Sequence, residues 1–204
     1  MALRTLRTNL LDAVNQMLSC IGGAAVGSLD TDNPEVASAV AILEETTRTV
    51  LAEGWNFNTE KEYPFIPDTD DEILVPDTLL SFHLALSRHS GSSYAIVERQ
   101  GKFYDKLAHT YKFDTTLHCD VVWGFNFDDC PQPFKEYITA RASRAYASRL
   151  VTSKEQVELI AQDEGSCRAL CVSYDTLTGQ QSMFGWQNGS NVYPSYLPLD
   201  ALVR

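Results

Sequence analysis

Apolar residues near the start of the chain recur at the spacing of amphipathic helices. The first predicted helix follows a capping Thr8 or Asn9, precedes Gly22, and buries Leu10, Val14, Met17, Leu18 and Ile21. A second helix begins at Asn33–Pro34, where Asn can cap and Pro suits the first helical position, and it ends at Gly54. The pattern therefore predicts two helices before residue 55.

The apolar period shortens toward two after Trp55, and prolines become frequent, which predicts a β region up to about residue 128. The clearest hairpin joins residues 94–99 to residues 102–105, because Gly101 supplies the positive φ of a tight reversal. Weaker strand candidates are residues 73–75, 79–86 and 117–123.

Helical spacing returns after Pro131 and continues to about residue 174. The third predicted helix carries Phe134, Tyr137, Ile138, Ala142, Ala145 and Leu150. A capping box that starts at Ser153 opens a fourth helix, with Val157, Ile160, Ala161, Cys167, Leu170, Cys171 and Tyr174. Beyond it, residues 175–204 are polar but carry spaced aromatics, so we expect this arm to dock on its own domain or on a neighbour.

Composition and charge narrow the function classes. The 204 residues are 44% hydrophobic and 21% charged, which is typical of a soluble globular protein. A formal net charge of -11 argues against a protein that grips nucleic acid by neutralising phosphates. The five scattered cysteines favour a reducing compartment, and no apolar run is long enough to cross a membrane.

Motifs for catalysis and metal binding are absent from the sequence. It has no Gly-rich phosphate loop, nucleophile elbow or zinc-protease helix, so we expect no catalytic residue and no cofactor. The spacing of His109, His118, Cys119 and Cys130 matches no zinc pattern, so we expect no metal. We expect Cys167 and Cys171 to pack in the core.

Residues 30–72 hold twelve acids against Arg48 and Lys61. A solvated acidic face is the favoured interpretation, and a carboxylate pair for glycoside hydrolysis stays open.

Two charges interrupt the apolar faces of the third and fourth predicted helices. Arg141 and Glu164 stand where core residues are expected, and isolated buried charges are too costly. We expect them to pair with each other or to meet a neighbouring subunit. Arg144, Arg149 and Lys154 make this segment basic, opposite to the acidic second helix. This pattern favours either head-to-tail contact in a ring or salt bridges within one chain.

Short motifs in a shared order give the chain a family resemblance. They are residues 13–18 with Ile21–Gly22, Glu53–Asn58, Val75–Asp77, Gly101–Asp105 and Pro131–Arg144. In this order they resemble tail tubular protein A, the family of head-to-tail adaptors of short-tailed phages. Glu53 departs from the pattern, since a basic residue often precedes the Gly-Trp there, so no partner contact is transferred to it.

The resemblance implies an α+β fold built on a four-helix antiparallel bundle. Residues 1–54 would supply helices one and two, and residues 129–174 would supply helices three and four. An antiparallel β domain, residues 55–128, would be inserted between helices two and three, with Gly54–Trp55 as a structural turn. Residues 175–204 would form an irregular, extended C-terminal arm.

The resemblance also implies a structural, non-enzymatic protein of the virion tail, made in the host cytoplasm and not bound to membrane. A dodecameric ring would act as connector and gatekeeper between the portal protein and the tail nozzle protein, tail tubular protein B, with tail fibres nearby. Viral DNA would leave through the lumen without sequence-specific binding, repelled by acids. Interface candidates are Arg141, Arg144, Arg149, Glu164, Phe184, Trp186, Tyr193 and Tyr196.

Two other functions stay open at this point. One is a tail-associated polysaccharide hydrolase that uses paired carboxylates. The other is a host-surface binding module, which predicts an exposed aromatic patch on the β region from Phe103, Tyr104, Tyr111 and Phe113, although hairpin core also explains these residues.

Overall fold

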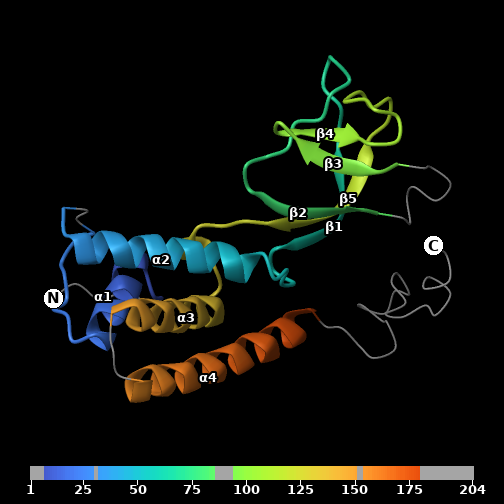
Figure 1. The fold of residues 1–204 in the computed structure, drawn as a ribbon. Coiled ribbons are helices and arrows are strands. Elements are labelled where there is room, and N and C mark those ends of the chain that lie inside the picture. The colour runs from blue at the N-terminus through green and yellow to red at the C-terminus, as the bar shows by residue number, and fades with distance from the viewer. Residues whose placement is uncertain (1–6, 30–31, 86–93, 151–153, 180–204) are drawn as a thin grey trace.

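The computed structural model describes residues 7–29, 32–85, 94–150 and 154–179, with helices at one end and strands at the other (Figure 1). Its α-helices are α1 (Leu10–Cys20), α2 (Pro34–Leu51), α3 (Gln132–Leu150) and α4 (Lys154–Gly179). Its strands are β1 (Thr59–Phe65), β2 (Leu79–Leu84), β3 (Ile96–Arg99), β4 (Lys102–Asp105) and β5 (Leu117–Trp123), and a 3-10 helix, η1, spans Phe127–Asp129. The predicted α+β class with antiparallel sheets is confirmed.

The helix starts follow from local capping. Asn9 Oδ1 accepts a hydrogen bond from the Asp12 amide at 2.8 Å, and Asn33 Oδ1 accepts one from the Glu35 amide at 3.0 Å. Both predicted caps are therefore confirmed. At the other end of the helical region, α4 continues to Gly179, beyond the boundary at residue 174 that the sequence predicts. The predicted cap at Ser153 lies outside the described residues.

The helices enclose one hydrophobic core, and α3 lies at its centre. Helix α3 packs on α1, α2 and α4, and its Phe134, Tyr137, Ile138 and Tyr146 are fully buried. Cys171 of α4 is buried there, as predicted, with its thiol 3.0 Å from the carbonyl oxygen of Pro133. Burial raises the pKa of this thiol to about 12, so it stays protonated and unreactive at neutral pH.

The strands form two antiparallel sheets over a second core. Strands β1, β5 and β2 lie in that order, and β3 pairs with β4. The predicted hairpin is confirmed: Gln100 and Gly101 both have positive φ, 54° and 71°. Strand β5 is also confirmed, but residues 73–75 make only an isolated bridge, through Leu74. Strand β1 was not predicted, because Pro64 and the irregular register after Glu60 hide its alternation.

A short turn joins α2 to the strands. The side chain of Asn58 is buried, and its Nδ2 donates to the carbonyl oxygens of Leu51 and Trp123 at 2.9 and 2.8 Å. Its Oδ1 accepts from the Trp55 amide at 2.8 Å. Gly54 has a φ of 75°, and a β-carbon there would lie 3.4 Å from Val122. We call residues 53–58 the joint, because one buried amide connects the end of α2 with the end of β5.

Replacing Asn58 with alanine should lower the free energy of unfolding by about 2–4 kcal/mol, because the protein loses the three hydrogen bonds of a buried amide side chain. Urea denaturation measures the loss. Asn56→Ala is the matched control, since only the backbone amide of Asn56 has a described hydrogen bond, and it should cost less than about 0.5 kcal/mol. Equal losses in the two variants would contradict the role of Asn58.

Candidate functional site

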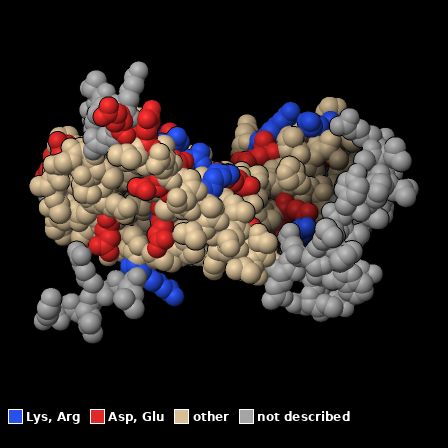
Figure 2. Space-filling view, turned by 90° about the horizontal axis from the view of Figure 1, so that it is seen from below, with Lys and Arg blue, Asp and Glu red and all other residues tan. Residues whose placement is uncertain are grey.

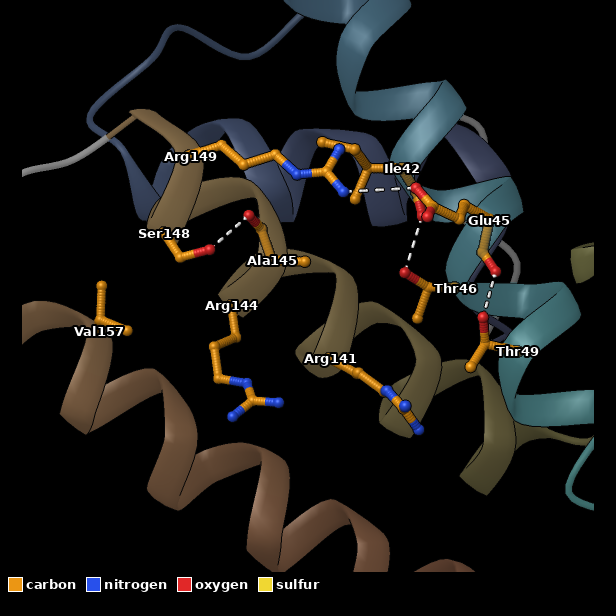
Figure 3. Close-up of a pocket in the computed structure, with 10 residues that line it drawn as sticks. All are labelled: Ile42, Glu45, Thr46, Thr49, Arg141, Arg144, Ala145, Ser148, Arg149 and Val157. Atoms are coloured by element: carbon orange, nitrogen blue, oxygen red, sulfur yellow. Dashed lines mark hydrogen bonds and ion pairs between the residues drawn. The ribbon is translucent and has the colours of Figure 1, made fainter.

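A groove of about 350 Å³ lies between α2, α3 and α4 (Figure 3). Arg141, Arg144 and Arg149, three residues that the sequence predicts for an interface, all line it from α3. Successive helical turns place them along one side of the helix. The other lining residues are Ile42, Glu45, Thr46, Thr49, Ala145, Ser148 and Val157. The structure thus brings these three arginines together.

The arginines of the groove are paired within the chain. Arg149 reaches Glu45 of α2 at 3.4 Å, and Arg144 reaches Glu164 of α4 at 2.5 Å. Arg141 does not pair with Glu164, as the sequence analysis expected, but with Glu53 at 2.8 Å. The reason is position along α3: Glu164 lies level with Arg144, nearly one turn beyond Arg141. The predicted alternative of salt bridges within one chain accounts for all three arginines.

Glu53 is the centre of a cluster that fastens α4. Its carboxylate accepts from Arg141 at 2.8 Å and from Arg168 of α4 at 3.1 Å. The hydroxyl oxygen of Tyr137 accepts from the same two guanidinium groups, at 3.1 and 2.6 Å. Burial alone would lower the pKa of Arg141, but its hydrogen bonds to Tyr137 and Glu53 outweigh burial and raise it. We call these four residues the Glu53 cluster.

A second contact ties α4 to the joint. The amide of Asn56 donates to the carboxylate of Asp175 at 2.8 Å, and the ring of Tyr174 lies edge-on to that of Phe134. The sequence analysis did not predict that Arg168, Asp175 and Tyr137 hold α4 against the joint. The sequence held one sign of this contact: Glu53 is an acid at a position where the resembled pattern often has a base. The end of α4 at Gly179 is therefore held beside the joint, where the residues of the arm follow.

Most acids of residues 30–72 are exposed, and Figure 2 shows acidic side chains spread over the helical half of the molecule. Among those that the structure describes, Glu62 and Glu72 are half-buried, and Glu72 pairs with Lys102. This distribution agrees with the solvated acidic face that the sequence favours. Within the described ranges, no group of three or more His, Cys, Asp or Glu could hold a metal ion, and no helix is long and apolar enough to cross a membrane.

The aromatic candidates divide into two groups. Phe184, Trp186, Tyr193 and Tyr196 lie outside the described residues. In the β region, Phe103 and Phe113 are buried, 0% and 3% exposed, so the exposed patch that the binding-module alternative predicts is not formed by them. The ring of Tyr104 lies tilted against that of Tyr111, and the guanidinium group of Arg99 lies over the Tyr104 ring. Hairpin core is the explanation that the structure supports.

Replacing Glu53 with alanine should loosen α4, because Arg141 and Arg168 lose a shared carboxylate while Arg141 stays half-buried. We expect a loss of about 1–2 kcal/mol in the free energy of unfolding. We also expect the backbone amides of α4 to exchange hydrogen faster than in the unaltered protein, and those of α1 to exchange at an unchanged rate. Glu60→Ala, an exposed acid of β1, is the control and should change neither quantity. Unchanged exchange in α4 of the Glu53→Ala protein would contradict the clamping role.

Comparison with known proteins identifies the family of the chain. A family model described as Tube, tail tubular protein, matches residues 11–181, from the first turn of α1 to just beyond α4. The chain is also similar to Tail tubular protein A of Klebsiella phage KP34, with 31% identity over 122 residues, or 60% of this chain. The match spans 62% of the length of that relative. This chain belongs to the tail tubular protein family.

Proposed function

We propose that the protein is the head-to-tail adaptor of a short-tailed phage, a ring of identical copies between the portal protein and the tail nozzle protein. The observation that carries the proposal is the family match, which runs from α1 through the strands to α4 and so concerns the whole described architecture. Membership of this family makes the chain a structural component of a phage tail. The ring, its number of copies and its partners are the proposed refinements.

In this proposal the helices act as an antiparallel bundle and residues 55–128 as a domain inserted into it. Two observations support the division: the described helices and strands have separate hydrophobic cores, and the joint connects them through Asn58. The bundle then supplies contacts between copies, and the β domain is free to meet the nozzle protein and the tail fibres. Such a division matches the separation of the two halves in Figure 1.

The arm after α4 has the role of a docking segment. The Glu53 cluster and Asp175 hold α4 against the joint, so the arm starts from a fixed point. Its aromatics, Phe184, Trp186, Tyr193 and Tyr196, would bury apolar area against the portal or a neighbouring copy on assembly. Arg144 and Arg149, with half-exposed side chains, would border the same contact.

The acidic charge suits a channel for DNA. A protein with a net charge of -11 repels phosphates, so DNA can slide through a lumen of such copies without binding to it.

The hydrolase alternative gains no support from the groove. Its ten lining residues include one carboxylate, Glu45, and three arginines, whereas glycoside hydrolysis needs two carboxylates.

Co-sedimentation with assembled portal rings of its own phage tests the proposal. The full chain should pellet with the rings, and electron microscopy of the pellet should show a ring of this protein stacked on the portal. A chain that stays monomeric and in the supernatant would overturn the adaptor function.

The double variant Phe184→Ala/Trp186→Ala tests the arm, because it removes two of its apolar anchors. It should need at least about tenfold more protein for half-maximal binding to the portal rings. Asn188→Ala/Asn191→Ala, in the same arm, is the control and should bind like the unaltered chain. Equal binding by both double variants would exclude these aromatics from the contact.

A further inference from the structure

The groove between α2, α3 and α4 combines apolar side chains with guanidinium groups. Ile42, Ala145 and Val157 contribute the apolar part of its lining. Arg144 projects toward α4 and Arg149 toward α2, so positive charge borders the groove on two sides (Figure 3). An occupant that fits this lining carries apolar groups together with a negative charge.

The hydroxyl groups of the groove already have partners, whereas one arginine has donors to spare. Thr46, Thr49 and Ser148 each donate to a backbone carbonyl oxygen of their own helix, at 2.7, 2.9 and 2.9 Å, so they require no polar occupant. Within the described residues, Arg149 contacts one oxygen of Glu45 at 3.4 Å, and its side chain is 55% exposed. Since a guanidinium group carries five N–H donors, Arg149 can bind a second carboxylate and keep this pair.

One segment outside the described residues has the matching chemistry. Residues 197–203 read Leu-Pro-Leu-Asp-Ala-Leu-Val, and Asp200 is the single acid of residues 180–204. Proline favours an extended backbone, and in an extended chain Pro198, Asp200 and Leu202 project to one side. That side presents one carboxylate between two apolar groups. We call residues 197–203 the leucine–aspartate segment.

The other segments outside the described residues do not match the groove. Residues 1–6 and 86–93 each contain an arginine and no acid, so the arginines of the groove would repel them. Residues 30–31 contain an acid but no apolar side chain, and residues 151–153 contain a valine but no acid. Charge and apolarity together therefore select the leucine–aspartate segment.

The arm is long enough to bring this segment to the groove of its own chain. Helix α4 ends at Gly179, and Val157 lies 22 residues earlier, about 33 Å away along the helix axis. The 21 residues from Gly179 to Asp200 can span up to about 70 Å when extended. Because Asp175 holds the end of α4 at the joint, the segment is tethered to a fixed point of the same chain. Such tethering gives a high effective concentration, which favours docking within the chain over docking on another copy in dilute solution.

We infer that the leucine–aspartate segment folds back and occupies the groove of its own chain. Asp200 binds the guanidinium groups of Arg144 and Arg149. Pro198 and Leu202 bury apolar surface against the apolar residues of the groove. The contact lies within one chain, so it does not depend on the proposed ring.

This contact would fix both ends of the stretch that carries the aromatics of the arm. Residues 180–196 start at the end of α4, which is held at the joint, and would end at the groove. A loop tethered at both ends has less conformational freedom to lose on binding than an arm with a free end. In the adaptor proposed above, the groove would thus prepare the aromatics from Phe184 to Tyr196 for the portal.

Photo-crosslinking in the full chain tests the contact. Ala201→p-benzoylphenylalanine places the photoreactive group next to Asp200, and a mixture of ¹⁴N-labelled and ¹⁵N-labelled copies is irradiated in dilute solution. We expect the arm to crosslink to residues 42–49 or 141–149, with the same isotope in both peptides. Asn188→p-benzoylphenylalanine, in the same arm, is the control and should not give this product.

Charge reversal tests the role of Asp200. Asp200→Lys should lower the yield of the crosslink from position 201 at least about fivefold, because arginines repel a lysine. Adding Arg149→Glu should restore most of the yield, since opposite charges then meet again. Asn191→Lys adds a positive charge elsewhere in the arm and is the control, with unchanged yield. Arg149 is exposed, so urea denaturation should show little change in stability.

The outcomes separate this contact from the proposed function. Crosslinks to the groove within one isotope, lost in Asp200→Lys and recovered with Arg149→Glu, establish the contact. The absence of a crosslink to the groove, a crosslink that joins different isotopes, or equal yields in Asp200→Lys and Asn191→Lys would overturn it. None of these measurements uses portal rings, so the adaptor function is decided by co-sedimentation alone.

Discussion

The buried side chain of Asn58 is the interaction on which the rest of the described structure depends. It bonds to backbone groups of α2 and of the turn, which are close in the sequence, and to Trp123 of β5, which is 65 residues away. Without it the Trp55 amide would lose its side-chain partner and the end of α2 would lose its hydrogen-bonded link to β5. The same turn carries Glu53 and Asn56, to which α4 is fastened. One six-residue segment therefore sets the position of the strands and of the last helix relative to the bundle core.

Charge pairing within the chain limits how this protein can assemble. The sequence places a basic third helix opposite an acidic second helix, which is compatible with contacts between copies or within one copy. The structure uses the charges within one copy, since Arg149 meets Glu45 and Arg141 meets Glu53. Half-exposed pairs of this kind contribute little stability individually, but they orient α4, and orientation decides which of its faces stays exposed.

Features with local causes could be predicted from the sequence. Asn9, Asn33–Pro34 and Gln100–Gly101 act on neighbouring backbone, so the helix starts and the hairpin followed from their residue types. The partner of Arg141 could not be predicted, because it depends on how α4 is placed against α3 and on where the turn after α2 lies. Strand β1 was missed for a related reason: its pairing with β5 is long-range, and its own alternation is interrupted.

The two hydrophobic cores explain how one small chain can serve as an assembly part. The described helices and strands each have their own hydrophobic core, and Leu80 of β2 also packs against the helical one. The joint links the two halves by hydrogen bonds from Asn58, and the segment from β5 to α3 is a second covalent connection between them. In the proposed ring, this division would let the helices meet neighbouring copies while the strands meet other partners.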